Sequence, residues 1–254
     1  MGAAVTGIIA FLCIIGGMVV GMLMRSVLPV NHLSGDSKDT VRISSGMIAT
    51  LTALVLSLLV TSAKNKFDDM NDTLAQSSSK IIMLDRNLAQ YGSETQAIRE
   101  QLRSTVAAWV TASWHIDKTA MDEMSVFEKS PATMEIVGNK LRELVPQNDS
   151  QREFQSDSLK ICKELVQTRW LEIEKAQTSL PKVFLVMLLF WLAMLFGSFG
   201  LFAPPNKTVL VALVVCAISV ASAIFIIEEM NKPLSGIVKV SNATLVKAVE
   251  NIGK

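Results

Sequence analysis

Small and hydroxyl-bearing residues recur along one face of an otherwise apolar stretch of the chain. Residues 43–63 contain no Asp, Glu, Lys or Arg. Within them, small or polar residues follow at spacings of three or four, which places them on one side of an α-helix: Gly46, Thr50, Ala53, Ser57 and Thr61. In a membrane helix, Ser and Thr hydroxyls can replace water around a passing ion, or they can support close packing against another helix. The pattern leaves both uses open.

Charged residues stand at both ends of this stretch. Arg42 precedes it, and Lys64 and Lys66 follow it. If copies of the stretch surrounded an axis, these side chains would attract anions to both mouths. The alternative is ordinary contact with lipid headgroups. Glu228 and Glu229 end the last apolar stretch of the chain and are candidates for gating or for contact with an ion. The alternative is that they face lipid headgroups or pair with Lys232.

Three glycines in the first apolar stretch, Gly16, Gly17 and Gly21, indicate helix packing. Gly17 and Gly21 make a G-x-x-x-G arrangement, which lets a second helix approach closely. The motif by itself names no partner helix.

The sequence lacks the patterns that carry catalysis or hold a cofactor. It contains no phosphate-binding loop, dinucleotide fingerprint, zinc motif or nucleophile elbow. Its 3 cysteines and 2 histidines show no metal-ligand spacing. A formal net charge of +1 gives no strong field for nucleic acid. We therefore expect no enzyme, no metal and no cofactor, and we expect membrane lipid and inorganic ions as partners rather than nucleic acid.

Four charge-free apolar stretches must position these residues. They cover residues 3–24, 43–63, 183–203 and 208–227. Crossing a hydrocarbon core of ~30 Å takes about 20 helical residues, so each is long enough. The first is expected to be a retained span rather than a cleaved signal, because residues 1–5 carry no Lys or Arg and bulky residues occupy 22–24. The sequence thus predicts an all-α membrane protein with four transmembrane helices.

A soluble stalk of four helices is predicted between the second and third spans. Residues 67–91 contain no Gly or Pro, and they carry a heptad seam: Phe67, Met70, Leu74, Ser77, Ile81, Leu84, Leu88 and Tyr91. The predicted organisation is a transmembrane hairpin (1–63), a helical soluble domain (64–182), a second transmembrane hairpin (183–230) and an amphipathic C-terminal helix (231–254). That last helix could lie on the membrane or against the stalk, and the sequence favours neither.

Basic residues near the spans predict the orientation. With four spans, the stalk and both termini share one side of the membrane. That side carries Lys64, Lys66, Lys175, Lys182, Lys232 and Lys239, and the other side carries Arg25, Lys38, Arg42 and Lys207. Cytoplasmic loops are richer in Lys and Arg, so we expect the stalk and both termini in the cytoplasm.

Four stretches of the chain carry a resemblance to a known family. They are Val41 to Leu51 with Ala53 to Leu56, Leu84 to Arg86 followed by Leu88 to Gly92, Phe196 to Pro204, and Glu229 to Pro233. Together they resemble the signature of a bacterial membrane family described as bestrophin-like, over nearly the whole chain. Bestrophins are oligomeric ion channels, commonly pentamers, with pore-lining second helices and a cytosolic helical domain. The resemblance implies a homo-oligomer, a pentamer by analogy, in the bacterial cytoplasmic membrane. Bestrophins narrow their pores with aromatic rings in the second helix, whereas residues 43–63 contain none.

Two functions agree with these features. In the first, copies of the chain form an ion channel whose axis is lined by the second span. In the second, the protein is a non-conducting membrane sensor or scaffold whose helical domain binds a ligand or partner, and the hydroxyl stripe serves packing alone. The two differ in whether the stripe faces a wet axis or is buried between helices.

Overall fold

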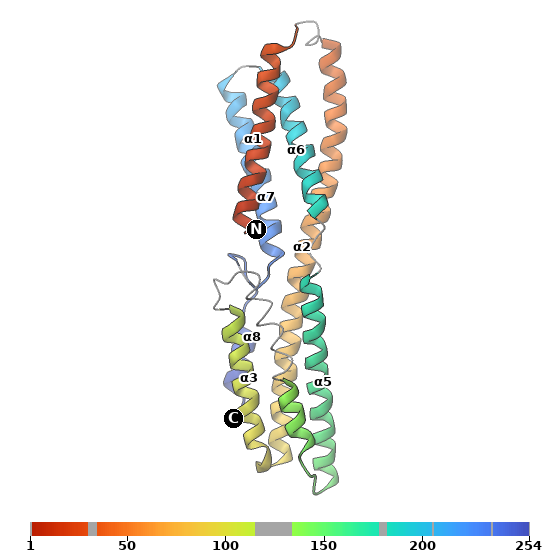
Figure 1. Cartoon of the computed structure of the whole chain (residues 1–254), viewed down its shortest axis with the longest axis vertical. Helices are drawn as coiled ribbons and strands as arrows, with labels where there is room; N and C mark the ends of the chain where they lie inside the picture. Colours follow the sequence, from red (N-terminus) through yellow and green to blue (C-terminus); the bar gives the residue numbers. More distant parts are fainter. Residues whose placement is uncertain are drawn as a thin grey trace. The chain divides into compact units, whose positions relative to one another are not determined.

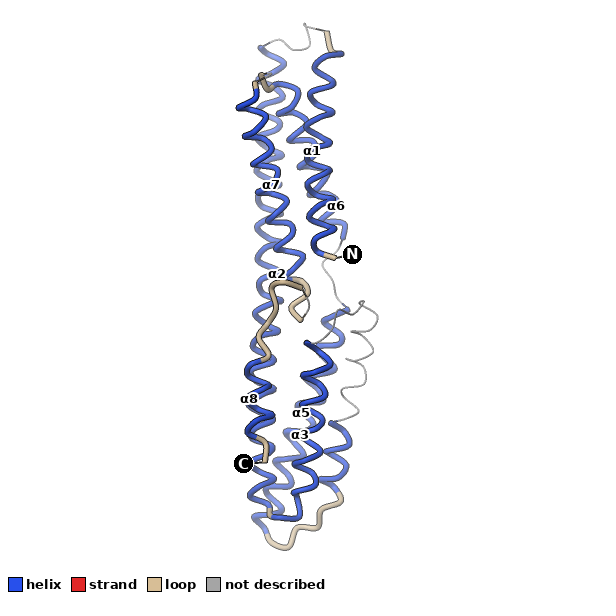
Figure 2. The backbone as a smooth tube through the Cα atoms, turned by 90° about the vertical axis from the view of Figure 1, so that its left-hand side faces the viewer, coloured by secondary structure: helices blue, strands red, loops and turns tan. Residues whose placement is uncertain are grey.

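The computed structural model describes residues 2–29, 35–114, 134–177, 182–204, 206–234 and 236–253. Figure 2 shows that this described part of the chain consists of helices and loops, without strands. The chain divides into two compact units. Met1–Lys66 and Leu180–Lys232 form the transmembrane unit, and Phe67–Ser179 and Pro233–Lys254 form the second unit.

Four helices are long and apolar enough to cross a bilayer, which confirms the four predicted spans. They are α1 (Ala3–Val27), α2 (Gly35–Tyr91), α6 (Lys182–Phe202) and α7 (Lys207–Met230). Helix α2 is continuous from the second span through the heptad seam, and no Gly or Pro interrupts residues 67–91. Its residues up to Lys66 belong to the transmembrane unit, and those from Phe67 belong to the second unit.

In the transmembrane unit, α1 lies beside α6 and α7 (Figure 1). The buried core residues of this unit come from all four spans: Ala10, Ile14, Met18, Leu59, Ala63, Leu188, Leu192, Leu195, Phe196, Ala217, Ile224 and Ile227. Lipid tails are as apolar as these side chains, so close packing rather than removal from water must hold the helices together.

Glycines bring α1 and α6 close together. A Cβ atom at Gly17 would overlap the carbonyl group of Ala193, and one at Gly21 would overlap the carbonyl group of Gly197. On the α6 side, a Cβ at Gly197 would lie 3.3 Å from the Gly17 carbonyl oxygen. Gly16 is different, because it is exposed and its Cβ would meet nothing within 4 Å. It lies about 100° around the helix from Gly17, so it takes no part in this contact.

The second unit is built from the remainder of α2 and from α3 (Gln96–Trp114), α5 (Asp149–Gln177) and α8 (Ala243–Asn251), with a further helix at 134–142. The predicted heptad seam faces its core, where Leu74, Ile81, Leu84 and Leu88 are buried. They pack against apolar residues of the other helices: Ile98, Leu102, Val106, Val137, Leu141, Ile161, Cys162 and Leu165. The predicted helical region between the second and third spans is confirmed.

A buried ion pair ties α2 and α3 to the end of the chain. Arg99 donates from Nε and Nη2 to the two carboxylate oxygens of Asp85 at 2.7 and 3.0 Å. The Gly253 N–H donates to the same carboxylate at 3.3 Å. The side chains of Arg99 and Asp85 are 11% and 3% exposed. The hydrogen bond with Asp85 raises the pKa of Arg99 above its usual value, although burial acts in the opposite direction.

The C-terminal segment differs from the single helix expected over 231–254. Helix α8 covers Ala243–Asn251, and the residues before it form a turn in which the Val240 N–H donates to the Pro233 carbonyl at 2.9 Å. Proline fixes its own backbone angle and has no N–H to donate, which favours a turn over a helix at this point. Leu245 and Ala248 of α8 are buried in the core of the second unit. The sequence left two locations open for the C-terminal helix, the membrane surface and the stalk. In the structure, α8 packs against the other helices of the second unit.

Candidate functional site

The hydroxyl stripe of α2 faces away from the rest of its own chain. All five of its members are exposed: Gly46, Thr50, Ala53, Ser57 and Thr61. The Thr50 hydroxyl donates to the Gly46 carbonyl at 3.0 Å, so its hydrogen is used within the helix. Its oxygen still has an acceptor lone pair for a group outside the helix.

The opposite side of α2 packs against the transmembrane unit. Thr52, Leu59 and Ala63 are buried, with exposed fractions of 5%, 5% and 0%. Ile48 and Val55 pack against the same core. Successive helical residues are about 100° apart, which puts this group roughly half a turn from the stripe. The stripe therefore does not serve packing within a single chain.

A flank of large apolar residues runs along α2 beside the stripe. Its members are between 50% and 69% exposed: Ile43, Met47, Leu51, Leu54 and Leu58. Helix α2 thus has one side packed on its own chain, one side carrying hydroxyls and one side suited to lipid tails or another apolar surface.

Charged side chains flank the stripe and end the last span. Arg42 and Lys64 are exposed, and Lys66 is half-buried. The helix rises by roughly 33 Å from Arg42 to Lys64, close to the ~30 Å of a hydrocarbon core. Glu229 is buried at 7% exposure and Glu228 is half-buried, both in the last turn of α7. The carbonyl end of a helix disfavours negative charge, so local helix stability does not explain these two carboxylates.

Two contacts of this unit were not foreseen from the sequence. The Ser45 hydroxyl donates to the Ser198 hydroxyl at 3.0 Å, and Ser198 donates to the Leu195 carbonyl at 2.7 Å, which links α2 to α6. Gly197 and Gly200 supply the α6 side of the close contact with α1. The signal available was the Gly-Ser-Phe-Gly sequence at 197–200, where small residues interrupt an aromatic-rich span.

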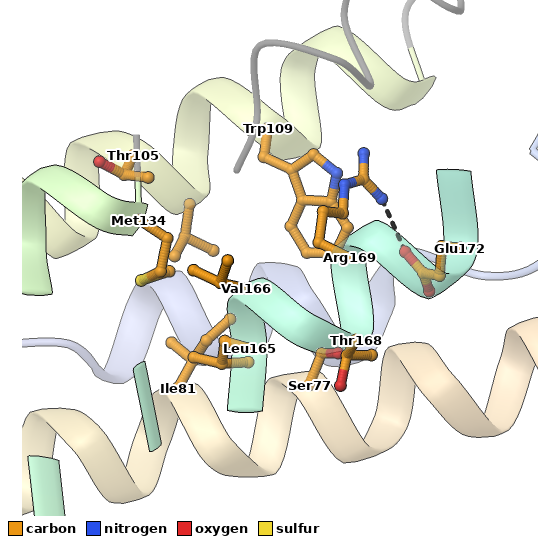
Figure 3. Close-up of a pocket in the computed structure, with 11 residues that line it drawn as sticks. Ser77, Ile81, Thr105, Trp109, Met134, Leu165, Val166, Thr168, Arg169 and Glu172 are labelled. Atoms are coloured by element: carbon orange, nitrogen blue, oxygen red, sulfur yellow. Dashed lines mark hydrogen bonds and ion pairs between the residues drawn. The ribbon is translucent and has the colours of Figure 1, made fainter. Parts of the chain in front are cut away.

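The second unit contains a cavity of about 50 Å³ between residues of α2, α3 and α5 (Figure 3). On one side, the Arg169 guanidinium carbon lies 4.9 Å from the centroid of the Trp109 ring. Arg169 Nη1 donates to Glu172 Oε2 at 2.8 Å, and both side chains are 9% exposed. Burial lowers the pKa of Arg169, and the neighbouring Glu172 acts in the opposite direction. The sequence did not predict this site, because its residues come from segments far apart in the chain.

Among the residues that the structure describes, no group of three or more His, Cys, Asp and Glu side chains is arranged to hold a metal ion.

Comparison with known proteins identifies the family. Residues 12–245 match the Bestrophin-like domain. No curated protein matches the chain. The fold is similar to the crystal structure of a bacterial bestrophin homologue from Klebsiella pneumoniae, with 16% identity, a TM-score of 0.63, and coverage of 94% of this chain and 97% of the homologue. A variant of that homologue carrying one substitution gives 15% identity, a TM-score of 0.65 and the same coverage. These structures show a shared fold, and the domain match over most of its length shows that the chain belongs to the bestrophin-like family.

Proposed function

We propose that the protein is a homo-oligomeric ion channel in which several copies of α2 surround an axis lined by Gly46, Thr50, Ala53, Ser57 and Thr61. The observation that carries the proposal is the orientation of the stripe. Its residues are exposed, and they lie on the side of α2 opposite the buried Thr52 and Leu59. A row of hydroxyls across a membrane is suited to replacing water around a permeating ion.

The rest of α2 supports the same arrangement. The apolar flank beside the stripe can meet the next copy or lipid, so that hydroxyls face the axis and apolar side chains do not. In this arrangement Arg42, Lys64 and Lys66 stand near the two mouths, and Glu228 and Glu229 are candidates for gating or ion contact. Membership of the bestrophin-like family agrees with the channel and, by analogy, with a pentamer. Basic residues near the spans are more numerous on the side of the second unit and both termini, so we propose that this side faces the cytoplasm of a bacterial cell.

A matched pair of substitutions on α2 tests the axis. Thr50 and Thr52 both donate their hydroxyl to the carbonyl four residues earlier, at 3.0 and 2.7 Å. Thr50 is exposed on the stripe and Thr52 is buried in the bundle. Thr50→Val and Thr52→Val therefore remove the same group from opposite sides of one helix. Ion flux from liposomes containing the purified protein is measured for several cations and anions at controlled potential.

The channel predicts that Thr50→Val changes the flux ratio between ions about fivefold, the equivalent of losing one hydrogen bond of roughly 1 kcal/mol. Thr52→Val should leave the ratio unchanged, because its side chain does not reach the axis. Equal effects of the two substitutions would contradict the assignment of the stripe. A dimer with both stripes buried, seen in an experimental structure of the assembly, would favour the sensor or scaffold.

A second measurement uses the accessibility of introduced cysteines. In a background with Cys13 and Cys216 replaced, Thr50→Cys and Thr61→Cys should react with a charged, water-soluble thiol reagent. Leu54→Cys on the apolar flank should not, because lipid or a neighbouring copy covers it. If Leu54→Cys reacted and Thr50→Cys did not, water would contact the apolar flank of α2 rather than the stripe, which would contradict the proposed axis.

A further inference from the structure

An apolar groove lies between α1 and α7, which are neighbours in the transmembrane unit (Figure 1). The lining positions recur at spacings of three and four on both helices, so one face of each helix lines the groove. Gly7 and Ala221 are buried and form its floor, whereas Ile8 and Ile218 are exposed and form its rims. A Cβ at Gly7 would lie 3.1 Å from the Cβ of Phe225, so the two helices meet closely at the floor.

The groove suits a hydrocarbon chain. It lies on membrane-spanning helices, and its walls carry bulky apolar side chains, among them Phe11 and Phe225. Ser222 is the polar side chain among the described lining residues, and its hydroxyl donates to the Ile218 carbonyl at 2.8 Å. An empty groove in a bilayer loses dispersion contacts along its walls, and a thin, flexible acyl chain restores them.

Carboxylates continue the groove face of α7 toward the end of that helix. Glu228 and Glu229 follow Phe225 by three and four residues, so they lie one turn beyond the groove. Side chains of a helix lean toward its N-terminus, which inclines Glu228 back toward the groove. Residues 228–232 contain these two carboxylates and one basic residue, Lys232. This end of α7 therefore carries a net negative charge.

This charge favours a lipid with a cationic group in its head. The carbonyl end of α7 adds partial negative charge to that of the two carboxylates. A primary ammonium has three N–H donors for a carboxylate, whereas a trimethylammonium has none. A headgroup with a net negative charge is repelled. An ammonium here also gives the carboxylates a role, which local helix stability does not supply.

We propose that the groove between α1 and α7 binds an acyl chain of phosphatidylethanolamine, whose headgroup ammonium donates to the Glu228 carboxylate. The site goes beyond the channel and does not depend on it, because lipid binding is measured without ion flux. Its described lining residues belong to α1 and α7, whereas the proposed axis is lined by α2. A channel that conducts without this site, and a lipid site in a protein that does not conduct, are distinguishable results.

The first test compares three lipids on the wild-type protein. Full-length protein in detergent is titrated with phosphatidylethanolamine, phosphatidylcholine or phosphatidylglycerol of identical acyl chains, and native mass spectrometry counts the lipids bound to each chain. Phosphatidylethanolamine and phosphatidylcholine carry the same formal charges and differ in the N–H donors of the headgroup. Phosphatidylethanolamine should bind saturably and about tenfold more tightly than phosphatidylcholine, as expected for a hydrogen bond to a charged group, and phosphatidylglycerol should bind most weakly. Equal affinities for phosphatidylethanolamine and phosphatidylcholine would overturn the proposal.

Two matched pairs of substitutions locate the site. Ser222 and Ser219 are exposed on α7, and each donates to the carbonyl four residues earlier, at 2.8 and 2.9 Å. Ser222 lines the groove and Ser219 does not, so Ser222→Phe fills the groove and Ser219→Phe adds the same ring outside it. Glu228→Gln removes the charge at the end of the groove. Its control is Asp39→Asn, which removes an exposed carboxylate near the start of α2.

Each substitution has a defined outcome. Ser222→Phe should lose saturable binding of both zwitterionic lipids, and Glu228→Gln should bind them with nearly equal affinity. Ser219→Phe and Asp39→Asn should keep the wild-type preference. A preference that survives in Glu228→Gln, or unchanged binding in Ser222→Phe, would overturn the proposal. If Ser222→Phe instead dissociated the oligomer and kept the lipid preference, the groove would hold a second copy of the chain. The comparison of lipids on the wild type decides the matter if a variant does not fold.

Discussion

Exchange of Gly21 for alanine tests whether close backbone approach holds α1 against α6. A Cβ at Gly21 would overlap the carbonyl group of Gly197, and neither partner is the end of a flexible side chain that could move away. Helix α1 must therefore shift relative to α6. Gly16→Ala is the matched control on the same helix, because its Cβ would meet nothing within 4 Å.

The difference between the two variants isolates the clash. Both replace a helical glycine by alanine, so both gain the same intrinsic helix propensity of about 1 kcal/mol. Adding a methyl group to a packed interface costs typically 1–3 kcal/mol. Gly21→Ala should therefore be less stable than Gly16→Ala by about 1–3 kcal/mol, which corresponds to roughly 2–12 °C in the unfolding temperature of a chain of this size.

Thermal unfolding of the detergent-solubilised variants measures this difference in stability. All variants are heated at the same scan rate, because unfolding of membrane proteins is commonly irreversible. Fluorescence of the protein and loss of the monodisperse peak in size exclusion give two independent readouts. Equal unfolding temperatures for Gly16→Ala and Gly21→Ala would refute the close contact of α1 with α6.

Three further changes have defined outcomes. Ser57→Leu places a bulky side chain on the stripe and should lower ion flux to the level of protein-free liposomes without changing the oligomer measured by light scattering; unchanged flux would count against the axis. Asp85→Asn leaves Arg99 buried without its carboxylate and should lower the free energy of unfolding by about 3–5 kcal/mol. It should also increase hydrogen exchange in α8, because the Gly253 N–H loses its charged acceptor, whereas Asp149→Asn at the surface should change neither. Burial raises the pKa of the Cys162 thiol to about 12. At pH 8 only roughly one thiol in 10,000 is the reactive thiolate, so alkylation by iodoacetamide should stay slow until the pH approaches 12 or the protein unfolds; rapid native labelling at pH 8 would contradict the burial.

The spans and the seam of α2 could be predicted because they are local features. A span needs about 20 consecutive apolar residues, and each such run is visible without knowledge of its neighbours. The seam from Phe67 to Tyr91 repeats every three or four residues, and burial in the structure follows the same spacing. The stripe from Gly46 to Thr61 was visible for the same reason.

The partners of these faces could not be predicted, because the same pattern is compatible with several neighbours. Gly16, Gly17 and Gly21 look alike in the sequence, yet Gly16 points away from α6 and the other two contact it. The tail carried an amphipathic pattern that suited a membrane surface as well as a helical bundle. Its burial within the second unit depends on contacts such as that of Gly253 with Asp85, which join residues far apart in the chain.

The sequence by itself determined that the chain is helical, that four segments can cross a membrane, and that α2 carries hydroxyls on one side, since each follows from the spacing of residues along a single helix. The tertiary structure decided that this hydroxyl side of α2 is exposed and that α1 packs closely on Gly197 and Gly200 of α6. It also decided that Trp109, Arg169 and Glu172 line the same cavity. The physical reason is that these arrangements depend on which helices pack together. Which helices pack together depends on close contacts and buried charges between segments far apart in the chain. The periodicity of a single segment does not contain this information.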